Sequence, residues 1–141
     1  ELEQVTLDII ISTGIVSNMT THTPEYYYNS SLAHCVYYGA TVTKNGHKHL
    51  HGEIVSLGVL CLLTFEKKYE ERDAIMAFNA KMGFPVCFDD VEIDESEFEA
   101  MARKVVTATE WAYRPKGVTI EDFIACMKEQ NRCGRAYKKT L

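Results

Sequence analysis

The chain has 141 residues, and 46% of them are hydrophobic, which suits a single domain with a buried core. Its 20 acidic and 15 basic residues give a formal charge of −5, and no stripe of lysine and arginine interleaves with aromatic residues, so nucleic acid is not expected as a partner. The most apolar run, Ile54 to Phe65, is about twelve residues long, whereas a membrane span needs roughly twenty. The run indicates a buried helix, and no membrane partner is expected.

The first residues, Glu1 to Gln4, are acidic, contain no initiator methionine and lack the charged-then-apolar order of a signal peptide. A segment of a longer protein and a stand-alone protein both remain open. The five cysteines are odd in number and form no C-x-x-C pair, which favours reduced thiols that pack as small core residues. We therefore expect a cytoplasmic protein.

Two helices are predicted before the first turn. Residues 2–18 form a mainly apolar helix, because apolar residues recur there at spacings of three and four. A second helix is expected to start near Thr23 and Pro24 and to run to about Val42, since threonine caps helices and proline fits the first helical position. Asn45-Gly46 then requires a turn.

Further helices are predicted in the rest of the chain. A long helix begins at His51, and another spans Glu70 to Met82, where Gly83 and Pro85 supply the usual end signals. No long run alternates with a period of two, so no strand is expected. We predict an all-α fold, with residues 1–141 as a single all-helical metal-binding domain.

Capping patterns mark the last two helices. Asp94 and Glu97 form a capping arrangement ahead of a helix to about Ala108, and Thr119 with Asp122 does the same for a last helix that ends near Gly134. The segment 89–99 holds seven acidic residues. We interpret it as a solvated acidic face at a helix N-terminus.

All five histidines, His22, His34, His47, His49 and His51, fall within thirty positions. Imidazole is the commonest metal ligand, and catalytic zinc sites use about three protein ligands. In an extended loop, the H-x-H-x-H run places its three side chains on one side. If a helix begins at His51, however, His34 of the preceding helix is the natural partner of His51. Two alternatives without metal explain the same residues. His47, His49 and His51 could form an exposed polar loop, and His34 could be a core histidine.

Glu53 follows two residues after His51 and would diverge from it on a helix. It is therefore predicted to orient a ligand histidine rather than to bind metal itself. The sequence contains no G-x-G-x-x-G, no P-loop and no G-x-S-x-G, and no cysteine has a recognisable nucleophile setting. We assign no catalytic and no cofactor-binding residue on these grounds.

Two motifs at a fixed separation are informative. Ser31-Leu-Ala-His34 is followed, seventeen residues after its histidine, by the H-G-E-x-V-x-x-G run from His51 to Gly58. This pattern resembles the C-terminal helical domain of glycerol dehydrogenases, in the iron-containing alcohol dehydrogenase and dehydroquinate synthase superfamily. Residues 82–86 and 117–122 resemble further motifs of that domain, so the resemblance covers nearly the whole chain.

The resemblance implies a helical bundle like the C-terminal domain of the dehydroquinate synthase-like fold. In it, His34 and His51 would bind a metal ion. The ion could be zinc or iron(II), because two histidines and a carboxylate suit both metals. His47 and Glu53 would lie near the metal or the substrate. The family oxidises a secondary alcohol of a polyol or alcohol to a ketone by hydride transfer to NAD, and commonly forms homo-oligomers. Its N-terminal NAD-binding α/β domain, which supplies a carboxylate ligand, is absent from residues 1–141, so this chain alone is not expected to be active.

The chain also departs from the family. Glycerol dehydrogenases usually carry a histidine three residues after the first ligand, and dehydroquinate synthases carry one four residues after it; here those places hold Tyr37 and Tyr38. Three functions follow. The leading one is the metal-binding half of a glycerol dehydrogenase-like oxidoreductase. The others are half of a dehydroquinate synthase-like lyase and a non-catalytic, stand-alone helical module for assembly or regulation.

Overall fold

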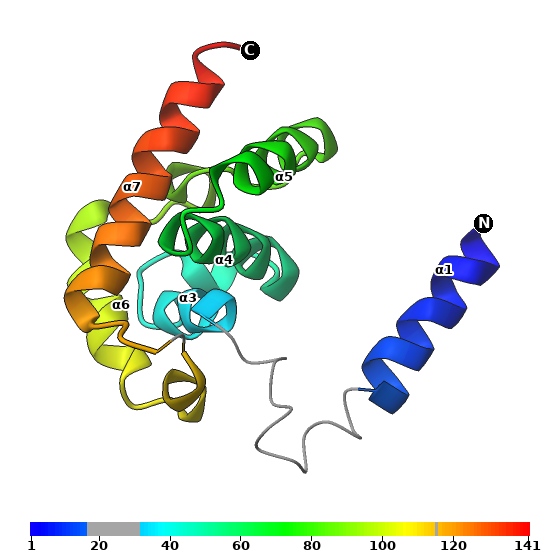
Figure 1. The fold of residues 1–141 in the computed structure, drawn as a ribbon, viewed down its shortest axis with the longest axis horizontal. Coiled ribbons are helices and arrows are strands. Elements are labelled where there is room, and N and C mark those ends of the chain that lie inside the picture. The colour runs from blue at the N-terminus through cyan, green and yellow to red at the C-terminus, as the bar shows by residue number, and fades with distance from the viewer. Residues whose placement is uncertain (17–31, 115) are drawn as a thin grey trace. The chain divides into compact units, whose positions relative to one another are not determined.

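The computed structural model describes residues 1–16, 32–114 and 116–141, and these fall into two compact units, Glu1–Ser30 and Ser31–Leu141. The described residues contain helices and turns, and no strand occurs among them. The all-helical prediction is therefore confirmed (Figure 1). His22 and the predicted helix start at Thr23 and Pro24 lie outside the described residues.

The first unit contains one continuous helical segment within its described part. It begins as α1 (Leu2–Ile9) and continues as the π-helical η1 (Ile10–Val16). This agrees with the predicted helix over residues 2–18 as far as the description reaches. No side chain of α1 or η1 is buried.

The described part of the second unit is built from five α-helices joined by loops and short 3-10 turns. The α-helices are α3 (Leu32–Ala40), α4 (His51–Phe65), α5 (Tyr69–Met82), α6 (Phe98–Val105) and α7 (Ile120–Lys138). The 3-10 turns are η3 (Gly46–Lys48), η4 (Phe88–Val91), η5 (Glu95–Glu97) and η6 (Thr109–Tyr113).

Helix α4 is the centre of the second unit, because it packs against α3, α5 and α7 (Figure 1). Its sequence is apolar on most faces, which is expected of a helix surrounded by others. The core around it includes an edge-to-face pair, Phe88 and Phe98, whose ring centroids lie 4.6 Å apart. Phe123 of α7 is also fully buried. Helix α4 is therefore held on several sides, which fixes the position of His51 at its start.

The predicted starts of α4 and α7 and the predicted end of α5 are confirmed. Helix α4 starts at His51, where the Glu53 carboxylate accepts the Leu50 N–H at 2.8 Å. Helix α5 ends at Gly83, whose φ of 76° is the left-handed conformation that glycine adopts without strain. Helix α7 starts after Thr119, whose hydroxyl accepts the Asp122 N–H at 3.1 Å.

The last helix continues about one turn past Gly134, the residue expected near its end. Helix α7 continues to Lys138, and Gly134 is buried inside it. A Cβ at this position would lie 2.1 Å from the carbonyl oxygen of Val86, so the glycine allows a loop to approach the helix rather than ending it. Two other helices end earlier than expected: α3 ends at Ala40 and α6 ends at Val105.

The interpretation of residues 89–99 as a solvated face is wrong in part. Arg135 of α7 contacts Asp89 at 2.6 Å and Glu95 at 2.9 Å, and Lys138 pairs with Asp90. These ion pairs join the acidic segment to α7. Asp94 nevertheless caps η5 as predicted, because its carboxylate accepts the Ser96 N–H at 2.9 Å.

All five cysteines are free, and all but the half-buried Cys133 are buried. Burial, with Glu110 nearby, raises the pKa of the Cys35 thiol to about 12, and burial beside Asp90 raises that of Cys87 to about 11. Such thiols stay protonated and unreactive. Separately, within the described ranges, none of the helices combines the length and the hydrophobicity needed to cross a bilayer.

Candidate metal centre

The two predicted metal ligands lie side by side. His34 is on α3 and His51 is the first residue of α4, and their ring centroids are 5.4 Å apart with the planes inclined at 51°. The chain turns back between them through residues 41–50, where Asn45 and Gly46 form the expected turn. The helix–turn–helix arrangement predicted from the sequence is thus present, whereas metal binding by the pair stays a prediction.

The close approach of α3 and α4 depends on Gly58. A Cβ at Gly58 would lie 2.2 Å from the carbonyl oxygen of Ala33 and 2.8 Å from its Cα. Ala33 directly precedes His34 in the sequence. The last glycine of the H-G-E-x-V-x-x-G motif therefore allows the α4 backbone to contact the α3 backbone next to the histidine.

Burial favours a neutral His34. Desolvation of the His34 side chain lowers its pKa, and the nearby His51 lowers it further. Glu110 raises the pKa, but the net shift is downward. The Nδ1 atom of His34 is buried and has no hydrogen-bond partner among the described residues. A neutral imidazole with an unpaired nitrogen is the form that can bind a metal ion.

The loop histidines have other surroundings. His47 is exposed, whereas His49 lies between two carboxylates, with Nδ1 at 3.8 Å from Glu53 and Nε2 at 3.7 Å from Glu92. The Nε2 atom of His49 is buried and makes no hydrogen bond to the described part of the chain. The three histidines of residues 47–51 are therefore not gathered around one point, since the rings of described residues that contact His51 are those of His34 and Tyr37.

Glu53 serves the start of α4. One of its oxygens, Oε2, accepts the Leu50 N–H and lies 3.8 Å from His49. The contacts of the described residues do not join this carboxylate to His51. Its predicted role in orienting a ligand histidine stays a prediction.

A small cavity of about 230 Å³ adjoins the histidine pair through Tyr37. Its lining combines hydroxyl, imidazole and apolar groups from α3, the following loop and α4: Tyr37, Thr41, Gly46, His47, His49 and Ile54. His47 and His49 thus share a cavity wall. The side chains present can both donate and accept hydrogen bonds to a small hydroxylated molecule.

Sequence reasoning missed two neighbours of the pair. Tyr37 places its ring 4.2 Å from the His51 ring, and Glu110 of η6 acts electrostatically on His34. Tyr37 stands three residues after His34, so helical spacing could have placed it on the same face. Nothing in the sequence relates Glu110 to His34, because they are separated by most of the chain.

A complete metal site is not formed by the described residues alone. Within residues 1–16, 32–114 and 116–141, no three or more His, Cys, Asp or Glu side chains are grouped so as to hold a metal ion. A catalytic zinc site uses about three protein ligands, so His34 and His51 fit as part of such a site.

Two known proteins that are similar to this chain are described as glycerol dehydrogenases, one of them as a probable one. No protein-family model matches the chain. In sequence, it is 31% identical over 113 residues to the glycerol dehydrogenase of Thermotoga maritima, an alignment that covers 77% of this chain and 31% of that protein. In structure, it is similar to a probable glycerol dehydrogenase from Sinorhizobium meliloti 1021, with a TM-score of 0.70 and 26% identity over 75% of this chain and 32% of that chain.

The chain therefore contains a helical domain related to polyol dehydrogenases. More narrowly, the chain has glycerol dehydrogenase homologues in sequence and in structure, over about three-quarters of its length. This confirms the resemblance found in the motifs. The chain spans about a third of the length of the relatives it matches.

Proposed function

We propose that this chain is the metal-binding helical part of an NAD-dependent polyol or alcohol dehydrogenase, which oxidises a secondary alcohol to a ketone by hydride transfer. The observation that carries the proposal is the pair of His34 and His51, with ring centroids 5.4 Å apart at the crossing of α3 and α4. The similarity to glycerol dehydrogenases supports a small polyol as substrate. A nucleotide-binding domain outside residues 1–141 would supply the NAD site and a carboxylate ligand.

His34 and His51 would hold zinc or iron(II). Bound there, the ion supplies Lewis-acid polarisation of an alcohol oxygen. His34 contributes a half-buried imidazole whose lowered pKa keeps its lone pair available. His51 contributes an exposed imidazole, which a substrate or a partner domain can reach.

The cavity beside Tyr37 is the proposed place for the part of the substrate that does not react. Its volume of about 230 Å³ suits a molecule of a few carbons, and Tyr37, Thr41 and His47 bring polar groups to it. Hydroxyls and imidazoles bind sugar-like hydroxyls by donating and accepting hydrogen bonds. His47 is thereby proposed as a substrate contact.

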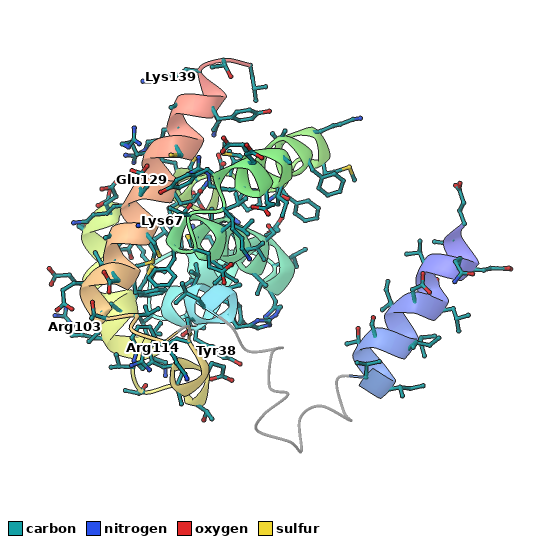
Figure 2. All side chains as sticks on the ribbon, in the orientation of Figure 1. Tyr38, Lys67, Arg103, Arg114, Glu129 and Lys139 are labelled. Atoms are coloured by element: carbon teal, nitrogen blue, oxygen red, sulfur yellow. The ribbon has the colours of Figure 1, made fainter. Side chains whose placement is uncertain are left out.

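The direct test uses the complete reading frame that contains these 141 residues. With zinc, NAD and glycerol, it should produce NADH, and His34→Ala and His51→Ala should each abolish that production. Arg103→Ala, an exposed side chain of α6, serves as the control and should leave the rate unchanged (Figure 2). Absence of NADH with every small polyol tested would overturn the dehydrogenase proposal.

The same protein distinguishes the other two functions. Phosphate release from the heptulosonate substrate of dehydroquinate synthases would assign it to that branch instead. Zinc binding without turnover of either kind would indicate a non-catalytic module.

A further inference from the structure

Tyr37 contacts both the histidine pair and the neighbouring cavity. Its ring centroid lies 4.2 Å from that of His51 with the planes at 65°, and the same side chain lines the cavity of about 230 Å³. Tyr37 is partly buried and packs against the hydrophobic core. The phenol ring is therefore a fixed surface against which the imidazole ring packs.

His51 has few other constraints. It is exposed at the first position of α4, and its ring makes no hydrogen bond to the described residues. Histidines that bind metal are usually oriented by a hydrogen bond from the second ring nitrogen to a carboxylate or a carbonyl. The nearby carboxylate, Glu53, accepts the Leu50 N–H instead. Among the described residues, the aromatic rings that contact the imidazole are those of Tyr37 and His34.

The ring geometry suits a positioning role. An interplanar angle of 65° is close to an edge-to-face contact, which aromatic rings favour and which restricts rotation of the smaller ring. Tyr37 follows His34 by three residues, so one face of α3 carries both a ligand and the group that contacts the other ligand. A second aromatic contact, with Tyr38 at 5.6 Å, supports the Tyr37 ring from its own helix.

We propose, on the basis of the proposed metal site, that Tyr37 is a positioning residue that orients the imidazole of His51 toward a metal shared with His34. It does so through the edge-to-face contact of the two rings and not through a hydrogen bond. Its hydroxyl is therefore dispensable for metal binding, whereas its ring is required.

Two measurements on the 141-residue chain test this role. The first is zinc affinity by calorimetry, for which Tyr37→Phe should stay within about twofold of the wild type, and Tyr37→Ala should be about tenfold weaker, the lower end for residues that support a ligand. The second is the order of the His51 ring in the metal-free protein, measured by NMR relaxation. That order should fall in Tyr37→Ala and persist in Tyr37→Phe. Tyr69→Ala, which removes a tyrosine of α5, is the matched control.

The outcomes separate this inference from the proposed function. If His34→Ala and His51→Ala bind zinc as the wild type does, the metal site is wrong, whatever Tyr37 does. If those two variants lose zinc while Tyr37→Ala keeps full affinity and an ordered His51 ring, the positioning role is overturned. If circular dichroism shows that Tyr37→Ala does not fold, Tyr37→Leu replaces it, because leucine retains bulk without an aromatic ring. Tyr37→Leu must then show the same loss of zinc affinity and of His51 ring order.

Discussion

Gly58 of α4 touches the backbone of Ala33 of α3, because a Cβ on the glycine would lie only 2.2 Å from the alanine carbonyl oxygen. Ala33 is followed at once by His34, and α4 begins with His51. The contact therefore sets how closely the helices that carry the two histidines approach each other. A glycine two turns away from His51 thus belongs to the geometry of the candidate metal site.

Gly58→Ala should destabilise the chain and weaken metal binding together. The added methyl group forces α3 and α4 apart, at a cost of about 1–3 kcal/mol typical of overpacking, or more because it meets backbone. Urea unfolding measures the stability, and calorimetry measures zinc affinity. The matched control is Gly52→Ala, also in α4, where a Cβ meets nothing within 4 Å. Equal stability of the two variants would show that the helices can separate at no cost.

Gly134→Ala should destabilise the chain without weakening the site. Its Cβ would lie 2.1 Å from the carbonyl oxygen of Val86, so α7 and the loop after α5 must move apart, again at about 1–3 kcal/mol or more. Neither segment carries a histidine. In urea unfolding the midpoint should fall, while zinc affinity under folding conditions matches the wild type. If Gly134→Ala lost as much zinc affinity as Gly58→Ala, the contact between Gly134 and Val86 would not be independent of the metal site.

Asp90 should make the stability depend on acid. Burial alone would raise its pKa, but hydrogen bonds from Lys138, from the Val86 N–H at 2.9 Å and from Cys87 outweigh burial and hold the pKa below the ordinary 3.8. A carboxyl with a lower pKa in the folded state stabilises fully above the unfolded pKa. Its contribution therefore disappears as the pH falls from 3.8 through the folded pKa.

Asp90→Asn removes that charge and is expected to lower the free energy of unfolding at pH 7 by about 1.5–3 kcal/mol, the usual range for hydrogen bonds to charged groups. The difference from the wild type should shrink as the pH is lowered below 3.8. Chemical unfolding monitored by circular dichroism at several pH values measures it. Glu99→Gln, in an exposed pair with Arg103, is the control and should change the stability little. A constant difference down to pH 2 would exclude this origin.

The sequence predicted the parts of the fold that local chemistry determines. Thr119 and Asp122 mark the start of α7 because they bond to each other's backbone, and Gly83 marks the end of α5 because the left-handed conformation suits glycine. Gly134 resembled such an end signal. Its actual role depends on Val86, which is distant in sequence, and a local pattern cannot reveal that contact.

In the candidate site, too, local contacts could be predicted from the sequence and tertiary contacts could not. His34 and His51 could be paired from the sequence because a turn at Asn45 and Gly46 brings consecutive helices together. The influence of Glu110 on His34 could not be predicted, since it requires η6 to pack beside α3. The position of His49 between Glu53 and Glu92 likewise depends on a tertiary contact.

The most direct test of the metal site is a zinc titration of the 141-residue chain and of four single histidine-to-alanine variants, at positions 34, 47, 49 and 51. Because the pair supplies two of the roughly three protein ligands of a catalytic site, we expect one ion per chain with modest affinity. His34→Ala and His51→Ala should each abolish this binding, whereas His47→Ala and His49→Ala should retain it. Zinc binding that persists in His34→Ala or His51→Ala, but is lost in His47→Ala or His49→Ala, would contradict this metal site. It would indicate that the loop histidines bind the ion.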